Sequence, residues 1–408
     1  MKCRVCDSDV ANFLSFGKIP LGNACLSQEQ LDKGNEEKFD LDIGFCSNCC
    51  LVQQTKPPPL TNLEKDYRNY SYVPVGESLR GNLKNLSKNI AAEFNLGKES
   101  LFVDIGSNDG TLLSSIKDHC RVLGIEPAVR ISEISSQSGV PTINAFFSHD
   151  VAESIISEHG YADAITVTQV LQHIPELIQF LKDVKRLLKP NGVLVVEGRY
   201  FGDTIIKNSF DTVYHEMIYF FTLTSLINIF ESIGMNVFKA EHVDVYGGSL
   251  RVYVKNGNKY GNEKAESVEI MKASEKKLML HKHHTYVEFA NKVYKLRSDI
   301  RQHILELKEK GMTIAGYGAP STSSTLLNFC SIGKEEIMYI VDDSPLKQGL
   351  FTPGTHIPIK DASALLEKRP DYLMLLAWRL QGEILPKLND LRDSGTKVIL
   401  PLPEIRIV

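Results

Sequence analysis

The sequence has neither a long uninterrupted apolar run nor a block of basic residues. None of its windows reaches the roughly 18 consecutive apolar residues of a membrane-spanning helix, and the opening MKCRVCDSDV lacks the apolar core of a signal peptide. The formal net charge is −4, whereas proteins that bind nucleic acid or anionic membranes usually carry a concentrated basic excess. We therefore expect a cytoplasmic protein that binds neither nucleic acid nor a membrane. Its 408 residues are too many for one compact core and predict two or three domains.

Cysteine occurs in a pattern that favours a metal over disulfides. The chain has eight cysteines, of which Cys3, Cys6, Cys46 and Cys49 form two C-x-x-C pairs in turn-like settings. Without an export signal, such thiols are more often metal ligands than disulfide partners. Four thiolates in two such pairs are typical of a tetrahedral zinc ion with no open position for catalysis, so we predict a structural Zn²⁺. Cys50 could replace Cys49, and a set of thiols without metal is the alternative.

A stiff linker follows the cysteine-rich segment. The stretch TKPPPLTNLEKDYRNYSYVP contains the three prolines 57–59 and then Tyr67, Tyr70 and Tyr72. Closely spaced aromatic side chains after a linker either pack or line a ligand site between domains. We include Tyr70 among the expected substrate contacts.

The segment SLFVDIGSNDGTLLSSIKDHCRVLGIEPA has the pattern of a strand, a glycine turn, a helix and a second strand. Asp104, Gly106 and Gly110 form D-x-G-x-x-x-G, and Glu126 ends the second strand. The glycines let the backbone approach a ligand, and an acid at that strand end can accept both hydroxyls of a ribose. A dinucleotide site would show G-x-G-x-x-G, whereas S-adenosylmethionine has one ribose and no pyrophosphate, and the pattern is similar to motif I of class I methyltransferases. The expected cofactor contacts are Asp104, Gly106, Ser107, Asn108, Gly110, Glu126 and Gln169.

The next segments continue the same type of domain. ADAITVTQVLQHIPEL supplies a strand that enters a polar loop, and LLKPNGVLVVEGRY supplies the end of a helix, a turn and a further strand. Gln169 and His173 then lie beyond the carboxyl end of a parallel strand, where ligands bind in open α/β sheets. The alternative for His173 is to cap the helix that begins near Pro175.

Several tracts together resemble the sugar C-methyltransferases that act on nucleotide-linked 4-keto-6-deoxy sugars, such as the tetronitrose and mycarose C-3-methyltransferases. VYHEMIYFF is similar to the family's Y-H-E-H tract, YGGSLRVYV to its H-G-G-S-L-R tract, and GYGAPSTSSTLLN, VDDSPLKQGLFTPGTHIPI, LLAWRLQGEIL and VILPLPEI to its third domain. The resemblance implies an α/β protein with a small zinc-binding domain (1–66), a class I S-adenosylmethionine methyltransferase domain of Rossmann-like type (67–262) and a second Rossmann-like domain (263–408). The third domain would open with a long helical linker (263–310), and we expect a monomer.

The resemblance also implies a reaction at carbon. A ketone at C4 acidifies the proton on C3, so a base removes this proton while a donor stabilises the enolate oxygen, and the carbanion then attacks the sulfonium methyl group. The expected catalytic residues are Tyr214 as the donor, His215, Glu216 and His173. The expected contacts with a nucleotide-sugar substrate are Tyr70, Tyr246, Ser249, Arg251, Tyr317, Ser321 and Lys347.

This sequence departs from the family at the position of the base. The second histidine of Y-H-E-H is Met217 here, and a thioether does not accept a proton near neutral pH. Tyr246, Thr322 and Arg379 also replace polar family residues. Three explanations stay open. His215, His173 or Tyr214 acts as the base; the acceptor is a sugar hydroxyl, an amine or a different carbon; or the chain binds its ligands but catalyses poorly or carries out a step that does not transfer methyl. An oxidoreductase is disfavoured, because neither Rossmann-like half has a full G-x-G-x-x-G.

Overall fold

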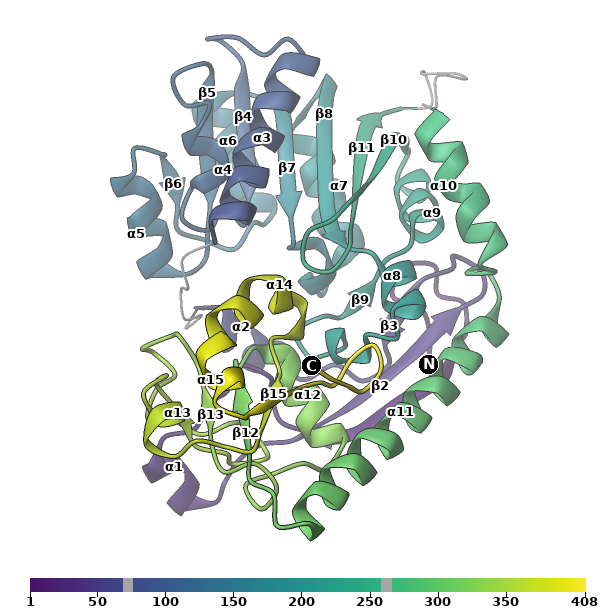
Figure 1. Ribbon diagram of the computed structural model, residues 1–408. Helices are drawn as coiled ribbons and strands as arrows, with labels where there is room; N and C mark the ends of the chain where they lie inside the picture. Colours follow the sequence, from purple (N-terminus) through teal and green to yellow (C-terminus); the bar gives the residue numbers. More distant parts are fainter. Residues whose placement is uncertain (69–75, 258–265) are drawn as a thin grey trace.

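The computed structural model describes residues 1–68, 76–257 and 266–408, which form three β-sheets (Figure 1). The seven-stranded sheet occupies the upper half of Figure 1, and the four-stranded and six-stranded sheets lie below it. Tyr70, an expected substrate contact, falls outside the described residues. Within the described ranges, every helix is too short or too polar to cross a membrane.

The N-terminal sheet is antiparallel, and its last strand comes from far along the chain. The strand order is β1-β2-β3-β9, and β9 pairs with β3 through Val52 opposite Phe220. The elements of this part are β1 (Val10–Ile19), α1 (Gln28–Lys33), β2 (Phe39–Cys46), β3 (Val52–Gln54), α2 (Leu60–Arg68) and β9 (Tyr219–Phe220). The segment expected to form the zinc-binding domain is thus completed by β9, a strand from the expected methyltransferase segment that begins two residues after Met217.

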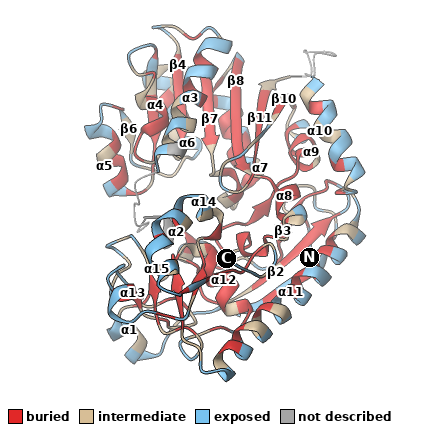
Figure 2. Ribbon diagram, viewed as in Figure 1, coloured by how far each residue is buried: buried red, intermediate tan, exposed pale blue. Residues whose placement is uncertain are grey.

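The central sheet has the order β10-β11-β8-β7-β4-β5-β6. Its strands are β4 (Leu101–Ile105), β5 (Arg121–Ile125), β6 (Thr142–Ile143), β7 (Ala162–Thr168), β8 (Leu188–Arg199), β10 (Met235–Val243) and β11 (Ser249–Asn256). The strands from β4 to β8 are parallel, and β10 and β11 form an antiparallel edge. Residues of β4, β7 and β8 are mostly buried and apolar because helices cover the sheet (Figure 2). The expected class I methyltransferase architecture is confirmed.

The helices of the central part connect these strands. They are α3 (Glu77–Glu93), α4 (Thr111–Ser114), α5 (Val129–Gln137), α6 (His149–His159), η1 (Leu171–His173), α7 (Leu177–Leu187), α8 (Phe201–Ile206), η2 (Phe210–Thr212) and α9 (Leu223–Ser232). The strand order reverses between β4 and β7, and the carboxyl ends of the strands beside such a reversal are where open α/β sheets bind ligands.

The third sheet has the order β14-β13-β12-β15-β16-β17 and is parallel except for β17. Its strands are β12 (Ile314–Tyr317), β13 (Ile340–Val341), β14 (Ile359–Lys360), β15 (Tyr372–Leu375), β16 (Lys397–Leu400) and β17 (Arg406–Ile407). Its helices are α12 (Ser321–Phe329), α13 (Ala364–Glu367), η3 (Trp378–Leu380), α14 (Gln381–Ile384), η4 (Leu385–Leu388) and α15 (Asn389–Asp393). The succession β12, α12, β13 is the second Rossmann-like half expected from the sequence.

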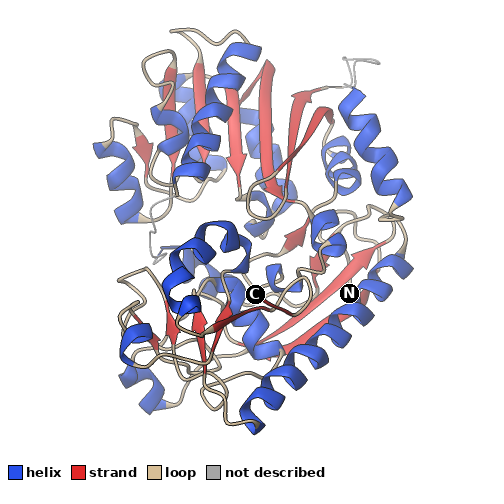
Figure 3. Cartoon of the chain, viewed as in Figure 1, coloured by secondary structure: helices blue, strands red, loops and turns tan. Residues whose placement is uncertain are grey.

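The long helix α11 joins the lower two sheets into one body. Helices α10 (Glu266–Lys277) and α11 (His283–Glu309) follow the central sheet, and α11 runs along the strands of the N-terminal sheet (Figure 3). Tyr286 of α11 stacks on Phe45 of β2 with ring centroids 4.4 Å apart, and Phe289 is buried beside them. The same hydrophobic cluster continues into the third sheet. Burial of each such aromatic side chain stabilises the fold by about 1.5–3 kcal/mol, so the N-terminal and third parts are held together by a shared core.

Candidate active site and zinc centre

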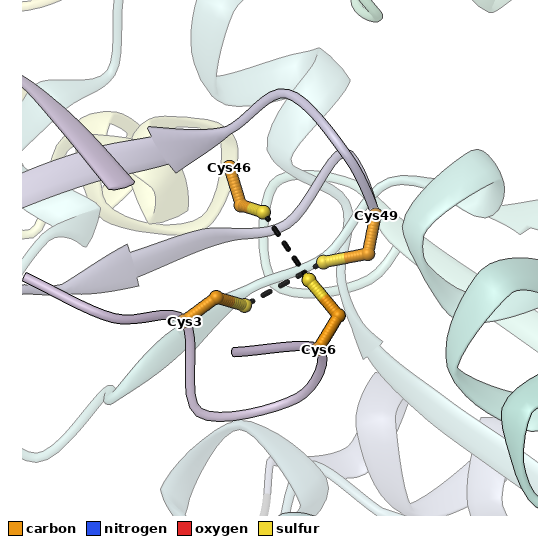
Figure 4. A group of neighbouring side chains, drawn as sticks. All are labelled: Cys3, Cys6, Cys46 and Cys49. Atoms are coloured by element: carbon orange, nitrogen blue, oxygen red, sulfur yellow. Dashed lines mark hydrogen bonds between the residues drawn. The ribbon is translucent and has the colours of Figure 1, made fainter. Parts of the chain in front are cut away.

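The four predicted cysteine ligands meet at the end of the N-terminal sheet (Figure 4). Their Sγ atoms all lie within 4.8 Å of one another, and the closest pairs are Cys3 with Cys49 at 3.6 Å and Cys6 with Cys46 at 3.5 Å. A tetrahedral zinc ion with Zn–S bonds of about 2.3 Å needs sulfurs about 3.8 Å apart, so these thiols fit zinc. Cys50 lies outside this cluster and packs in the hydrophobic core.

The glycine turn after β4 has the geometry of a cofactor loop. Gly106 and Gly110 have φ angles of 76° and 74°, and a Cβ atom on Gly106 would lie 2.3 Å from Cγ2 of Val170. Within the described ranges, Oγ of Ser107 and Oδ1 of Asn108 are buried without a hydrogen-bond partner. Buried polar atoms normally have partners, so these two fit a polar ligand such as S-adenosylmethionine.

Two acids stand beside this loop. Oε2 of Glu126 accepts a hydrogen bond from the backbone N–H of Asn108 at 3.1 Å, and Oε1 accepts one from Ala128 at 2.9 Å. Asp104 accepts one from Oγ1 of Thr166 at 2.6 Å. Burial raises the pKa of Asp104 to about 7, and burial also raises the pKa of Glu126 above its usual value. The backbone thus fixes the Glu126 carboxylate in one orientation.

A buried glutamine shapes the tract that contains the expected catalytic residues. Nε2 of Gln54, on β3, donates to the carbonyl oxygens of Tyr214, His215 and Met217 at 3.2, 2.7 and 2.7 Å. The backbone N–H of Met217 donates to the carbonyl oxygen of Tyr214, so the tract forms a turn. The Gln54 side chain thus holds three carbonyl oxygens of this turn from the N-terminal sheet.

The turn sends its side chains in different directions. Met217 is 2% exposed and belongs to the hydrophobic core, and His215 is fully buried with Nε2 3.1 Å from the carbonyl oxygen of Phe39. Burial lowers the pKa of His215 to about 4. Tyr214 is only partly buried. The structure therefore places His215 against Phe39 of the N-terminal sheet.

His173 lies beyond β7, in η1, and contacts the same tract. Its Nδ1 is 2.5 Å from the backbone carbonyl oxygen of Glu216. A carbonyl oxygen only accepts, so Nδ1 carries the proton and Nε2 carries the lone pair. Burial lowers the pKa of His173 to about 4, and the positive charge of Arg199 also lowers it. At neutral pH His173 is therefore an uncharged imidazole.

Gln169 connects the expected cofactor and substrate residues. Its φ angle is 56°, and its Nε2 donates to Oγ of Ser249, at the start of β11, at 3.1 Å. Tyr246 precedes this strand in a turn and is 41% exposed. Arg251 is buried in ion pairs with Glu197 and Glu241. Ser249 and Tyr246 thus lie at the carboxyl ends of β7 and β8. The guanidinium of Arg251 instead forms ion pairs with carboxylates of neighbouring strands in the sheet.

The third part reaches the tract through a chain of polar contacts. Oγ of Ser321, at the start of α12, donates to Asn23 at 2.6 Å, and Nδ2 of Asn23 donates to Oε1 of Glu216 at 3.3 Å. Tyr317 and Lys347, the other two expected substrate contacts of the third part, bind residues of that same part. The hydroxyl of Tyr317 lies 3.5 Å from Oδ1 of Asp343, and Nζ of Lys347 lies 2.7 Å from the carbonyl oxygen of Ala319. All three parts of the chain therefore meet at Glu216.

Three residues of this region were not predicted. Arg199 ends β8, Asn23 lies in the loop before α1, and Asp211 binds both Arg379 and Trp378. Gln169 and His173 were predicted because ligands bind beyond the carboxyl ends of parallel strands. The same argument would have predicted Arg199, because LLKPNGVLVVEGRY has the pattern of a strand that ends near this residue. The sequence has no comparable signal for Asn23 or Asp211, which are placed by contacts between distant segments.

An open surface hollow lies elsewhere on the central sheet. It is lined at the amino ends of β7 and β8 by residues including Tyr161, Lys182, Arg186 and Pro190. It contains none of the expected site residues and lies at the opposite end of the strands from the cofactor loop.

Comparisons with known proteins agree with this layout. Family models match in order a zinc binding domain (3–63), a methyltransferase domain (77–240) and a C-methyltransferase C-terminal domain (244–403). The C-methyltransferase NovU of Streptomyces niveus is 34% identical over 412 residues, which cover 100% of this chain and 96% of NovU.

Solved methyltransferase structures resemble about half of the chain. One from Anabaena variabilis is 16% identical, with a TM-score of 0.39, and covers 50% of this chain and 97% of its own. Magnesium protoporphyrin IX methyltransferase from Synechocystis is 12% identical, with a TM-score of 0.36, and covers 48% of this chain and 96% of its own.

The order of the three domains and the identity over the full length lead to one assignment. The zinc cluster and the cofactor loop supply the two binding sites that the sequence predicts. The chain belongs to the family of S-adenosylmethionine-dependent C-methyltransferases in which a zinc-binding domain precedes the methyltransferase domain and a C-methyltransferase C-terminal domain follows it.

Proposed function

We propose that the enzyme methylates a carbon next to the ketone of a nucleotide-linked 4-keto-6-deoxy sugar, with dTDP as the nucleotide, in deoxysugar biosynthesis. The resemblance of the tracts at 213–221 and 246–254 to those of sugar C-methyltransferases supports this substrate class. The match to NovU along the whole chain supports a reaction at carbon.

The observation that carries the proposal is the position and tautomer of His173. Its Nδ1 is bound to the carbonyl oxygen of Glu216, so Nε2 holds the lone pair at the carboxyl end of β7. Met217 is buried in the core, and His215 is held against Phe39. These positions favour His173 over His215 as the base, and we assign Tyr214 as the hydrogen-bond donor.

The residues around His173 have complementary roles. S-adenosylmethionine supplies an electrophilic methyl group when it is bound at the loop that contains Gly106. The hydroxyl of Tyr214 donates a hydrogen bond to the ketone oxygen as negative charge develops there. Glu216, tied to Asn23 and through it to Ser321, orients a sugar hydroxyl and fixes the third domain against the tract.

The test is incubation with S-adenosylmethionine and dTDP-, GDP- and CDP-linked 4-keto-6-deoxy sugars in deuterated water, followed by mass spectrometry and proton NMR. We expect a new methyl group on carbon and incorporation of deuterium beside the ketone. Methylation of oxygen or nitrogen would replace the proposed acceptor by another one. If the protein bound S-adenosylmethionine but neither exchanged nor methylated any of the sugars, the proposal would be refuted. The chain would then be a protein that binds its ligands without catalysis.

A further inference from the structure

Arg199 places a positive charge next to the proposed acceptor region. It is the last residue of β8, and its Cα is paired with that of Ser249 on β11. Its Nη1 donates to the carbonyl oxygen of Tyr246 at 3.2 Å, and its guanidinium lies over the Tyr246 ring, 5.9 Å from the centroid. The same charge interacts with Tyr214 and with His173. We call His173, Arg199, Tyr214 and Tyr246 the acceptor cluster.

The carboxylates near Arg199 are engaged by other cations. Asp211 binds Nη1 and Nη2 of Arg379 at 2.9 and 2.5 Å and also accepts from the indole of Trp378. Glu197, two residues before Arg199 on the same face of β8, binds Arg251 at 2.7 Å. Within the described ranges, Arg199 itself makes no ion pair with a carboxylate.

A guanidinium in this position favours an anionic ligand. Burial lowers the pKa of Arg199, yet an arginine stays charged at neutral pH. Keeping a partly buried cation without a carboxylate is unfavourable for folding, and a ligand that brings negative charge removes this cost. The peptide oxygen and the ring of Tyr246 satisfy only part of the guanidinium, which has five N–H donors.

We propose that Arg199 is a catalytic residue that binds the ketone oxygen of the acceptor and stabilises it as an enolate. This role rests on the proposed function. The carbon–hydrogen bond beside the ketone breaks, its proton moves to Nε2 of His173, and its electron pair forms the enolate. The enolate carbon then bonds to the methyl group as the sulfur–methyl bond breaks, which leaves S-adenosylhomocysteine. The negative oxygen lies between Arg199 and the hydroxyl of Tyr214 during both steps.

This arrangement accounts for chemistry without a base at Met217. An uncharged, buried imidazole is a weak base, so it needs a more acidic carbon acid than a histidine with an ordinary pKa. A charged donor on the ketone oxygen lowers the free energy of the enolate. Removing one such donor typically lowers a rate by about 10²–10³-fold. An enolate between Arg199 and the newly formed imidazolium also offsets the repulsion between these two cations.

The experiment measures hydrogen–deuterium exchange beside the ketone, without S-adenosylmethionine, on a sugar that the wild type exchanges. We expect Arg199→Met to lower the maximal exchange rate about 100-fold or more with little change in KM, and Arg199→Lys to retain part of the rate. Arg186→Met, which removes an exposed arginine from α7, is the matched control and should exchange like the wild type.

The outcomes separate this inference from the function on which it rests. An unchanged exchange rate in Arg199→Met, or a loss confined to KM, would overturn the role of Arg199 while the proposed function stands. Absence of exchange and methylation by the wild type on every keto sugar would overturn both. Calorimetry with S-adenosylmethionine shows whether each variant is folded, because Arg199 is not among the cofactor contacts.

Discussion

Nδ1 of His173 lies 2.5 Å from the backbone carbonyl oxygen of Glu216, and this contact fixes which nitrogen of the imidazole can act as a base. The carbonyl belongs to the turn that Gln54 holds from the N-terminal sheet. The N-terminal sheet is therefore connected, through Gln54 and this turn, to the residue that we propose as the base.

His173→Gln should lower the rate of exchange and of methyl transfer by at least about 100-fold, as expected for the loss of a general base. The affinity for S-adenosylmethionine should stay within a few-fold of the wild type by calorimetry. A pKa of about 4 for His173 further predicts that kcat/KM of the wild type does not fall between pH 8 and pH 6. His159→Gln, on the surface end of α6, is the control, and equal activity of both variants would exclude His173 as the base.

His215 should make the fold sensitive to acid. Its pKa is about 4 in the folded chain and about 6.5 when unfolded, so the unfolded state takes up a proton first as the pH falls. The neutral buried form contributes stability above pH 6.5 that is lost progressively between pH 6.5 and 4. From pH 7 to pH 5 this loss is about 2 kcal/mol.

His215→Gln removes this titration, so its free energy of unfolding should fall less steeply over the same range. Denaturant unfolding of both proteins at pH 7 and pH 5 gives the difference. The comparison cancels the contributions of His173 and the zinc ligands, which the two proteins share. Parallel pH dependences would show that folding does not change the pKa of His215.

Features that depend on residues close together in the sequence were predicted correctly. The cysteine spacing, the glycine turn at Gly106 and the alternation of strands and helices lead to the zinc cluster, the cofactor loop and the class I architecture. It did not predict that β9 completes the N-terminal sheet or that Gln54 holds the tract, because both depend on pairing between segments about 160 residues apart. Arg251 illustrates the same limit: its place in a tract that resembles H-G-G-S-L-R favoured a substrate contact, whereas Glu197 and Glu241 engage its charge.

The cofactor loop should not tolerate a side chain at Gly106. A methyl group there would overlap Val170, and the φ angle of 76° disfavours any other residue. We expect Gly106→Ala to weaken binding of S-adenosylmethionine at least about 10-fold by calorimetry. Gly81→Ala, in α3 where a Cβ atom meets open space, should bind normally and be slightly more stable. Normal binding by Gly106→Ala would show that this loop does not carry the cofactor.

Zinc content should distinguish two adjacent cysteines. Cys49 lies in the cluster of four thiols, whereas Cys50 packs in the core. Cys49→Ser should lose the ion, as measured by metal analysis of the purified protein, and should unfold at a lower temperature. Cys50→Ser should retain one zinc ion per chain. Loss of zinc from Cys50→Ser alone would assign the fourth ligand to Cys50.

The buried pair of Asp211 and Arg379 should be essential for joining the third domain to the catalytic tract. Asp211, in η2, is fully buried and binds Arg379 through two parallel hydrogen bonds, with the Trp378 indole as a third donor. Arg379→Met would leave the Asp211 carboxylate buried without its counter-charge, which costs about 3–5 kcal/mol. Asp211→Asn combined with Arg379→Met removes both charges and should recover part of this loss. Urea unfolding of the single and double variants measures the difference, and Lys387→Met on exposed η4 is the control. If the double variant were as unstable as the two single losses added together, the pair would not be energetically coupled.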